Sequence, residues 1–362
     1  MQLDFTSSLY LGLRHEYQSL RPWTQLTNGQ PAYLNESQNV ESVAQQLAEL
    51  QGCEYAVLGR SSLHLFWDLF GMLAKERISI FLDAGAYPIA RWGVERAMAR
   101  GIPVHSFPHK DADALYRLLK HGTNGRKPVL VSDGVCTFCS CAVHIAKYQE
   151  LANRFGCMVI IDDTQALGIL GANPKPVLPY GFGGGGSLQY QNISGPNMLI
   201  VASLAKGFGV PIAALSGSRE MIQNFKSRSE TRVHCSPPSA VDTAAAEHAL
   251  TLNQTTGDAL RTGLAQRVQH FHRALTSIRI TSDGSLFPVQ TLRLPPHLDP
   301  ENVHRQLLQL GVRTILRQGC NSQRPFLTLI ITARHSHNDI ENAVQAIAKV
   351  IHIQPQADLE GS

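Results

Sequence analysis

The sequence lacks the features that mark membrane, secreted and nucleic-acid-binding proteins. No apolar run in its 362 residues reaches the roughly 18 residues that a membrane-spanning helix needs. The N-terminus has neither the charged opening nor the long apolar core of a secretory signal. The formal net charge of +4 is spread along the chain, without the long run of Lys or Arg that would indicate a nucleic-acid partner. We therefore expect a cytoplasmic protein with no membrane span and no nucleic-acid partner.

The cysteine pattern is incomplete as a metal site. The seven Cys residues are Cys53, Cys136, Cys139, Cys141, Cys157, Cys235 and Cys320. Three of them fall within six residues, but the second CxxC that a structural zinc site usually needs is missing. Their odd number favours reduced, partly buried thiols over a disulfide framework. We predict no metal.

The pattern of the remaining sequence predicts an α/β fold. From about residue 43, helical periods alternate with short apolar runs, which is typical of a mostly parallel central sheet with helices on both faces. The glycine-rich stretch Gly181–Ser187 is predicted to be a flexible loop. After residue 240, a long Ala-rich helix, two strands and a terminal helix predict a smaller α+β C-terminal domain. The expected divisions are an N-terminal segment at 1–42, a large domain at 43–240 and a small domain at 241–362.

Two segments carry a chemical signal. IIDDTQALGILG ends an apolar strand with Asp162 and Asp163, at the edge where open α/β sheets bind ligands. LIVASLAKGFG leaves another strand and places Lys206 near two glycines. Pyridoxal 5′-phosphate (PLP) needs a lysine to form an imine, an acid to keep its pyridine nitrogen protonated, and donors for its phosphate. Singly, the acids are more typical of a cap or ion pair and the lysine of a solvated surface. Their joint occurrence, with Ser203 three residues before Lys206, predicts a PLP site.

These two segments resemble the α-oxoamine synthase family of fold-type I PLP-dependent enzymes. The resemblance extends loosely over nearly the whole chain. FTSSLYLGL is similar to the opening SNDYLGL of the family, SDGVCTFCSCAV to its EGVFSMDG stretch, and TARHSHNDIENAV to its closing TAAHxxxDI helix. The resemblance implies a homodimeric transferase. Its substrates would be an amino acid and an acyl thioester, carried by CoA or by an acyl carrier protein, and its product an α-aminoketone.

The resemblance also implies a role for individual residues. Lys206 would carry PLP as a Schiff base and shuttle a proton, and Asp162 would bind the pyridine nitrogen. Tyr87 would stack on the cofactor ring where the family has a histidine, although plain aromatic packing explains it equally well. The other expected cofactor contacts are Gln165, Ser203, Thr137, Ser61 and Ser62. A helix cap is an equally good interpretation of Ser61 and Ser62.

The substrate-binding residues of the family are mostly replaced. Gln165 stands where the family has a histidine, and Ser8 where it has an asparagine. The family arginine that binds the substrate carboxylate aligns with Thr328. Arg324 or Arg317 could replace it, since a guanidinium binds a carboxylate through two hydrogen bonds; both could equally be surface charges.

These departures leave two other hypotheses open. The first is a PLP-dependent aminotransferase, lyase or decarboxylase without acyl transfer, which Thr328 and Gln165 support. The second is a non-catalytic relative that acts through a protein partner. Retention of Asp162, Ser203 and Lys206 argues against this last hypothesis.

Overall fold

The computed structural model describes residues 2–34, 36–136, 142–319 and 322–352, and its chain divides into two units. The larger unit contains Leu13–Cys136 and Ala142–Asp258. The smaller unit is formed by the first twelve residues and by the chain after Asp258. The larger unit extends past residue 240, where the sequence suggested a boundary, because helix α9 packs on helix α1.

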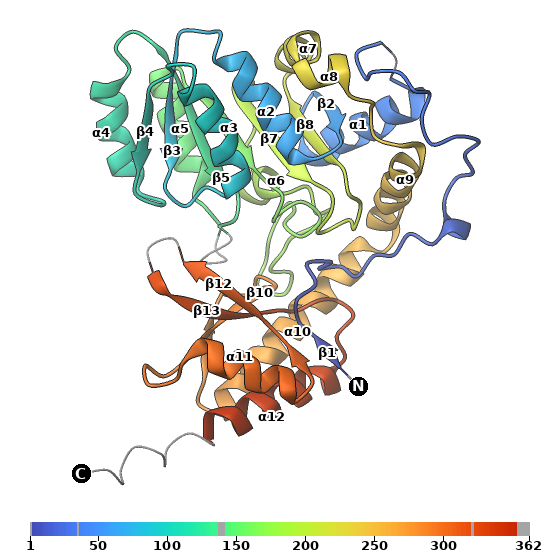
Figure 1. Ribbon diagram of the computed structural model, residues 1–362, viewed down its shortest axis with the longest axis vertical. Helices are drawn as coiled ribbons and strands as arrows, with labels where there is room; N and C mark the ends of the chain where they lie inside the picture. The colour runs from blue at the N-terminus through green and yellow to red at the C-terminus, as the bar shows by residue number, and fades with distance from the viewer. Residues whose placement is uncertain (1, 35, 137–141, 320–321, 353–362) are drawn as a thin grey trace. The chain divides into compact units, whose positions relative to one another are not determined.

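The larger unit is built on one seven-stranded sheet (Figure 1). Its strands, in spatial order, are β2 (Tyr55–Gly59), β8 (Ala213–Gly217), β7 (Met198–Ser203), β6 (Met158–Asp162), β5 (Lys127–Asp133), β3 (Ile78–Asp83) and β4 (Val104–Phe107). Only β8 runs antiparallel to its neighbours. The mostly parallel sheet expected from the sequence is therefore confirmed.

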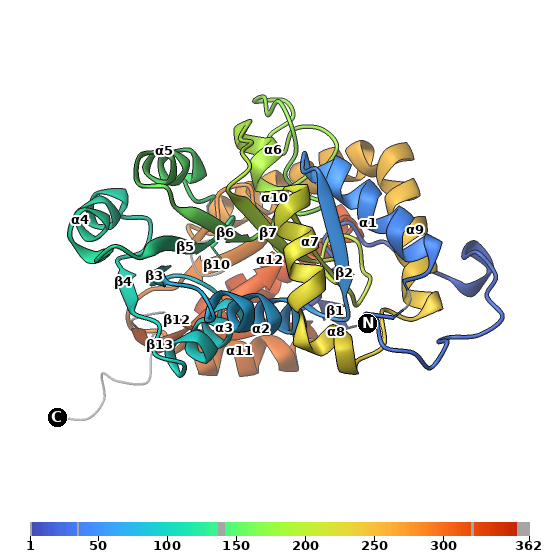
Figure 2. The ribbon, with the colours of Figure 1, turned by 90° about the horizontal axis from the view of Figure 1, so that it is seen from above.

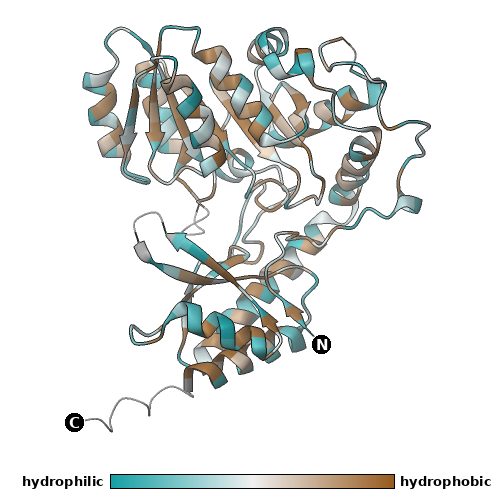
Figure 3. Cartoon of the chain, viewed as in Figure 1, coloured by the Kyte–Doolittle hydropathy of each residue, from teal (hydrophilic) through white to brown (hydrophobic). Residues whose placement is uncertain are grey.

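Helices cover both faces of this sheet (Figure 2). On one face lie α2 (Ser62–Leu73), α3 (Pro88–Met98) and α7 (Arg219–Arg228), and on the other α4 (Ala112–Gly122), α5 (Ile145–Phe155) and α6 (Ser187–Gln191). The remaining helices of the unit are η1 (Tyr17–Ser19), α1 (Gln38–Gln51), α8 (Glu230–His234) and α9 (Ala240–Thr255). Because the strands are buried on both faces, they are apolar along most of their length (Figure 3).

Two local predictions from the sequence are corrected by hydrogen bonds. Helix α1 begins at Gln38, five residues before the predicted start, because the Ser37 hydroxyl caps it by accepting from Val40 N–H. The glycine-rich loop is a hydrogen-bonded turn, in which Gly184 accepts from Gly168 N–H at 2.7 Å and Phe182 pairs with Ala172. Four of its glycines have positive φ. The shape of this turn therefore accounts for the high glycine content.

The smaller unit contains a four-stranded antiparallel sheet, in the order β12 (Ile315–Gly319), β13 (Ser322–Ile330), β10 (Val289–Arg293) and β9 (Thr281–Asp283). A short parallel pair joins β1 (Leu3–Asp4) to β11 (Val312–Arg313). Its helices are α10 (Gly257–Ser277), α11 (Pro300–Gln309) and α12 (His337–His352). In the described part of the chain, no helix is long and apolar enough to cross a membrane.

Candidate active site

Polar residues gather where the parallel strands of the large sheet end. Asp83, Asp133, Asp162 and Ser203 are the last residues of β3, β5, β6 and β7. The carboxyl ends of parallel strands meet at one edge of a sheet, which is where open α/β sheets bind ligands. The strand register fixes their levels: Asp133 is paired with Asp162, and Asp162 with Val201. Sequence positions that are far apart therefore form one cluster.

The alternation of side chains along the strands sorts this cluster into two faces. Val131 and Ile160, two residues before Asp133 and Asp162, lie in the core under α2 and α3. Leu130 and Ile161 lie in the opposite core, under α4 and α5. Asp133 and Asp162 therefore point toward the α2 and α3 face. Asp83 and Asp163 point the other way, and their contacts agree with this.

Asp162 is a buried carboxylate with few partners. The N–H of Thr164 donates to its Oδ1 at 3.0 Å. Burial raises the pKa of Asp162, and the Thr164 hydrogen bonds and the positive charge of Lys206 act in the opposite direction. A negative charge here is thus stabilised by a cation that belongs to the predicted site.

Lys206 lies in the turn that follows β7. Its Nζ is 5.6 Å from the centre of the Tyr87 ring, within the range of a cation–π contact. Tyr87 comes from the start of α3, and its N–H donates to Asp133 Oδ1 at 3.0 Å. The structure thus brings Lys206, Tyr87 and Asp162 together from three segments of the chain.

The turn of Lys206 packs tightly on the loop after the acid pair. A Cβ atom added to Gly207 would stand 2.4 Å from the carbonyl oxygen of Leu167 and 3.2 Å from the Cα atom of Gly168. Only glycine permits this approach of two backbones. The two motifs recognised in the sequence are therefore in direct contact.

The second acid, Asp163, has a structural partner. Its carboxylate accepts from the N–H of Ser187 at 2.9 Å and from the Ser187 hydroxyl, at the start of α6. Burial raises the pKa of Asp163 to about 6, although these hydrogen bonds lower it. Asp83 is satisfied in a similar way: burial raises its pKa, but His109 and the N–H of Gly85 bring it below its ordinary value.

The three candidate phosphate-binding serines lie at, or just after, the ends of two strands that finish at the same level. Ser203 is paired with Ala213, and Ala213 with Gly59, so β7 and β2 end two strands apart, about 10 Å at the usual spacing. Ser61 caps α2 by accepting from His64 N–H at 3.4 Å, and Ser62 is the first residue of that helix. Ser203 accepts from Ala205 N–H inside the lysine turn at 3.3 Å.

The two candidate carboxylate-binding arginines differ in their surroundings within the smaller unit. Arg317 donates from Nε to the Thr328 hydroxyl at 3.1 Å and from Nη2 to the Thr291 hydroxyl at 2.9 Å. Its guanidinium therefore lies on the residue that replaces the family arginine. Arg324 instead donates to the carbonyl oxygens of Pro296 and Leu298, which ties it to a loop.

The remaining predicted positions are Gln165, Thr137 and the cysteines. Gln165 is buried three residues after Asp162, whereas Thr137 lies outside the described residues, as do Cys139, Cys141 and Cys320. Among the described residues, Cys53, Cys157 and Cys235 are free thiols. Burial raises the pKa of the Cys53 and Cys157 thiols to about 12. Among described residues, no group of three or more His, Cys, Asp or Glu side chains could hold a metal ion.

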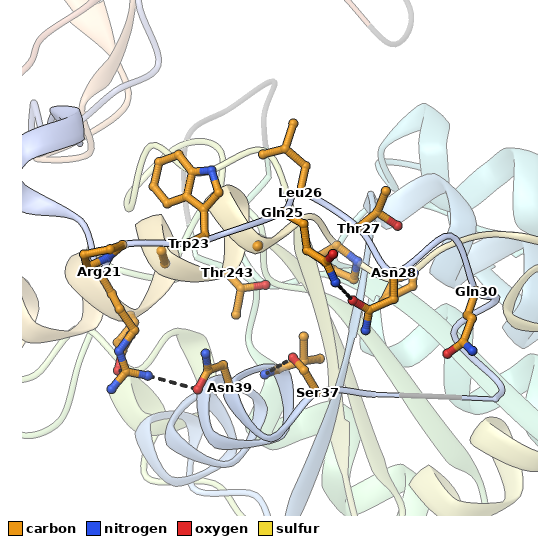
Figure 4. A pocket seen from close by; sticks show the side chains of 17 residues that line it. Arg21, Trp23, Gln25, Leu26, Thr27, Asn28, Gln30, Ser37, Asn39 and Thr243 are labelled. Carbon is orange, nitrogen blue, oxygen red and sulfur yellow. Dashed lines mark hydrogen bonds and ion pairs between the residues drawn. The ribbon is translucent and has the colours of Figure 1, made fainter.

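A separate hollow of about 120 Å³ lies between the N-terminal coil and the starts of α1 and α9 (Figure 4). Polar side chains in it bond one another, as when Arg21 donates to Asn39 at 2.9 Å. None of the predicted site residues lines it. We therefore locate the candidate site at the sheet edge and not in this hollow.

Sequence reasoning missed three residues at this edge: Thr164, Asp133 and Asp83, the last of which is satisfied by His109 and Gly85. Thr164 joins the two motifs, since its N–H donates to Asp162 and its hydroxyl accepts from Ser203 N–H at 3.0 Å. Asp133 is buried beside Asp162. Its signal was present in the sequence, because Asp133 ends an apolar run just as Asp162 does.

Comparisons with known proteins agree with this architecture. A family model described as aminotransferase class I and II matches residues 69–347. The 8-amino-7-oxononanoate synthase of Sodalis glossinidius is 24% identical over 357 residues, which are 96% of this chain and 87% of the relative. A structure of serine palmitoyltransferase from S. paucimobilis superposes with a TM-score of 0.84 at 15% identity, over 97% of this chain and 88% of that one.

A second solved structure is similar over almost the full length of both chains. The 8-amino-7-oxononanoate synthase from Francisella tularensis has a TM-score of 0.75 at 16% identity, over 98% of each chain. The fold expected from the sequence, a large mostly parallel sheet with a smaller α+β C-terminal part, is thereby confirmed. The structure adds that the smaller sheet is antiparallel.

Proposed function

Since the chain belongs to the aminotransferase class I and II family, we propose that it is a PLP-dependent transferase of the α-oxoamine synthase kind. It condenses an amino acid with an acyl thioester to give an α-aminoketone. The similarity to 8-amino-7-oxononanoate synthases over 96% of the chain supports this reaction. The single observation that carries the proposal is the convergence of Lys206, Asp162 and Tyr87 at one edge and face of the sheet.

The residues present at this edge fit PLP. Asp162 is a buried carboxylate that needs a cation nearby, and a protonated pyridine nitrogen would supply one. An aromatic ring and a lysine amine stand within 5.6 Å of each other. The cap of α2 at Ser61 and the lysine turn at Ser203 offer hydroxyls and helix N–H groups of the kind that bind phosphate.

Each side chain then has a distinct task. PLP, when bound, supplies an electron sink for the charge that develops at the α-carbon of the amino acid. Lys206 holds the cofactor through Nζ and moves a proton at that atom. Asp162 would keep the pyridine nitrogen protonated, Tyr87 would stack on the ring and exclude water, and Gln165 would donate to the ring hydroxyl. Thr164 ties Asp162 to the lysine turn.

The substrate carboxylate is assigned to Arg317. Its guanidinium is held by hydrogen bonds to Thr328, which aligns with the family arginine, and to Thr291. This contact supports Arg317, on the neighbouring strand, as its replacement. Arg324 is less suited, because two carbonyl oxygens already orient it. We also propose, from the family alone, a homodimer in the cytoplasm that uses a CoA or carrier-protein thioester.

A PLP-dependent aminotransferase, lyase or decarboxylase without acyl transfer is the second candidate. Thr328 and Gln165 are the observations that favour it. A screen of acyl-CoA and acyl-carrier-protein donors for amino-acid-dependent thiol release separates the two candidates. Release of thiol supports acyl transfer, whereas turnover of the amino acid without thiol release supports the second candidate.

The proposal predicts the visible absorbance of the cofactor. Purified protein incubated with PLP should absorb in the visible range, and Lys206→Ala should abolish that band because the proposal assigns the imine nitrogen to Lys206 Nζ. Lys175→Ala is the matched control, since Lys175 is an exposed lysine of the same unit, and it should leave the band unchanged. An unaltered band in Lys206→Ala would overturn the assignment.

A further inference from the structure

Asp133 has a place at the sheet edge that the roles above leave unexplained. It is the last residue of β5 and lies in register with Asp162 on β6. Neighbouring strands are about 4.8 Å apart, and side chains at the same level point to the same face. Asp133 is 3% exposed and Asp162 is 6% exposed. Two carboxyl groups are therefore buried side by side.

The hydrogen bonds of Asp133 are unequal. Its Oδ1 accepts from the N–H of Tyr87 at 3.0 Å, whereas its Oδ2 is buried and has no partner among the described residues. Tyr87 is the residue before α3, and Pro88 occupies the first helical position. The hydrogen bond thus holds the backbone from which the Tyr87 ring reaches toward Lys206.

The charges around Asp133 decide which acid of the pair is ionised. The charged groups that act on Asp133 are Asp162 on β6, Asp83 on β3 and His109 in the loop after β4. Lys206, in the turn after β7, acts on Asp162. Burial raises the pKa of Asp133 well above its usual range, and the charge of Asp162 raises it further, though the Tyr87 N–H lowers it. The charge of Lys206 and two hydrogen bonds from Thr164 lower the pKa of Asp162 and so favour its ionised form. Two adjacent buried carboxyls rarely ionise together.

We propose that Asp133 is a positioning residue of the PLP site, which as a neutral carboxylic acid anchors the backbone of Tyr87 and so sets its ring over Lys206. The inference rests on the proposed function for the identity of the cofactor. The protonation state of Asp133 belongs to the protein alone. It leaves Asp162 as the single negative charge of the pair.

The neutral state makes a specific prediction about substitutions. Asp133→Asn keeps a carbonyl oxygen for Tyr87 N–H and has the shape and charge of a neutral acid, so the dissociation constant of PLP should stay within about threefold of wild type. Asp133→Ala removes the anchor, and PLP should bind roughly tenfold more weakly, the usual worth of one hydrogen bond. Equal losses in the two variants would contradict a neutral Asp133.

A double-mutant cycle separates positioning of the ring from a general structural role. Asp133→Ala should weaken PLP binding in wild type but have little effect in Tyr87→Ala, since no ring remains to be positioned. Its effect on the free energy of unfolding should persist in both backgrounds. Additive effects of the two substitutions on PLP binding would show that Asp133 does not act through Tyr87.

The cofactor-free protein gives an independent readout. Its infrared difference spectrum against Asp133→Asn at neutral pH should contain a carboxylic acid C=O band, which a charged Asp133 would lack. Because this measurement needs no PLP, it distinguishes the two proposals. A protein that shows the band but never binds PLP overturns the proposed function, whereas a protein that binds PLP without the band overturns the role of Asp133. If Asp133→Ala does not fold, PLP binding by Asp133→Asn and this spectrum still test whether Asp133 is a neutral acid.

Discussion

Gly207 offers a direct test of whether the turn of Lys206 must pack on the loop after the acid pair. Alanine at this position would place its Cβ 2.4 Å from the carbonyl oxygen of Leu167. Real Cβ atoms essentially never come within 3.0 Å of another atom, so one backbone must move by at least about 0.6 Å. Neither partner is a flexible side chain. The shift must therefore reach either Lys206 or the loop that follows Asp162.

The size of the effect follows from the kind of contact. Overpacking a buried contact costs about 1–3 kcal/mol of the free energy of unfolding. For a unit of this size, each kcal/mol lowers the melting temperature by about 2–4 °C. Activity should fall further, since a misplacement of about 1 Å in a reactive group costs on the order of a hundredfold in rate. We expect loss of cofactor loading to exceed the loss of stability.

Denaturant unfolding and the visible absorbance with PLP measure the two effects on the same sample. Gly122→Ala is the control, because a Cβ there would lie 3.5 Å from the ring of Phe81, an ordinary contact, at the end of α4. It should be neutral or slightly stabilising and should load PLP normally. If Gly207→Ala matched this control in both measurements, the tight packing of the two motifs would have no functional meaning.

Two further predictions address the arginines and the second acid. Arg317→Met should weaken binding of the substrate amino acid about tenfold to a hundredfold, as expected for a lost charged hydrogen bond, and Arg324→Met should change it little. Titration of the PLP-loaded enzyme with amino acids measures both. A larger loss in Arg324→Met than in Arg317→Met would assign carboxylate binding to Arg324. Burial raises the pKa of Asp163 from 3.8 to about 6, so this group stabilises the folded protein fully below pH 3.8 and loses that contribution as pH rises through about 6. Asp163→Asn should remove that contribution, up to about 3 kcal/mol. The free energy of unfolding, measured with denaturant between about pH 4 and 7, should then change less with pH than in wild type. The same pH dependence in both proteins would refute a raised pKa at Asp163.

Much of the large unit could be predicted because its pattern is local. The alternation of strands and helices was expected from about residue 43, since buried strands are short apolar runs flanked by helical periods. The start of α1 was missed because it depends on one capping hydroxyl at Ser37, upstream of any apolar period. Composition suggested flexibility at Gly181–Ser187, but positive φ angles require glycine there even in an ordered turn.

The candidate site could be predicted only in part. Lys206 and Asp162 belong to motifs that are contiguous in the sequence, so they were found without the fold. Asp133 and Thr164 stand inside the quoted motifs, but their partners Tyr87 and Ser203 are distant in sequence, so their contacts required the fold. The choice between Arg317 and Arg324 likewise depends on cross-strand geometry: Ile315 is paired with Thr328, and Arg317 lies two residues further along the same face of β12.

Strand alternation explains why the two acids of the Asp162–Asp163 pair cannot exchange roles. Successive side chains of a strand point to opposite faces, so a pair at the end of β6 supplies one carboxyl to each side of the sheet. Asp162 faces the side of Tyr87 and Lys206, and Asp163 faces α6, where Ser187 binds it. Shifting the register of β6 by one residue would exchange them, and it would also place Ile161 under α2 and α3. The apolar cores on both faces fix the register of β6. They therefore determine that Asp162, and not Asp163, faces the candidate site.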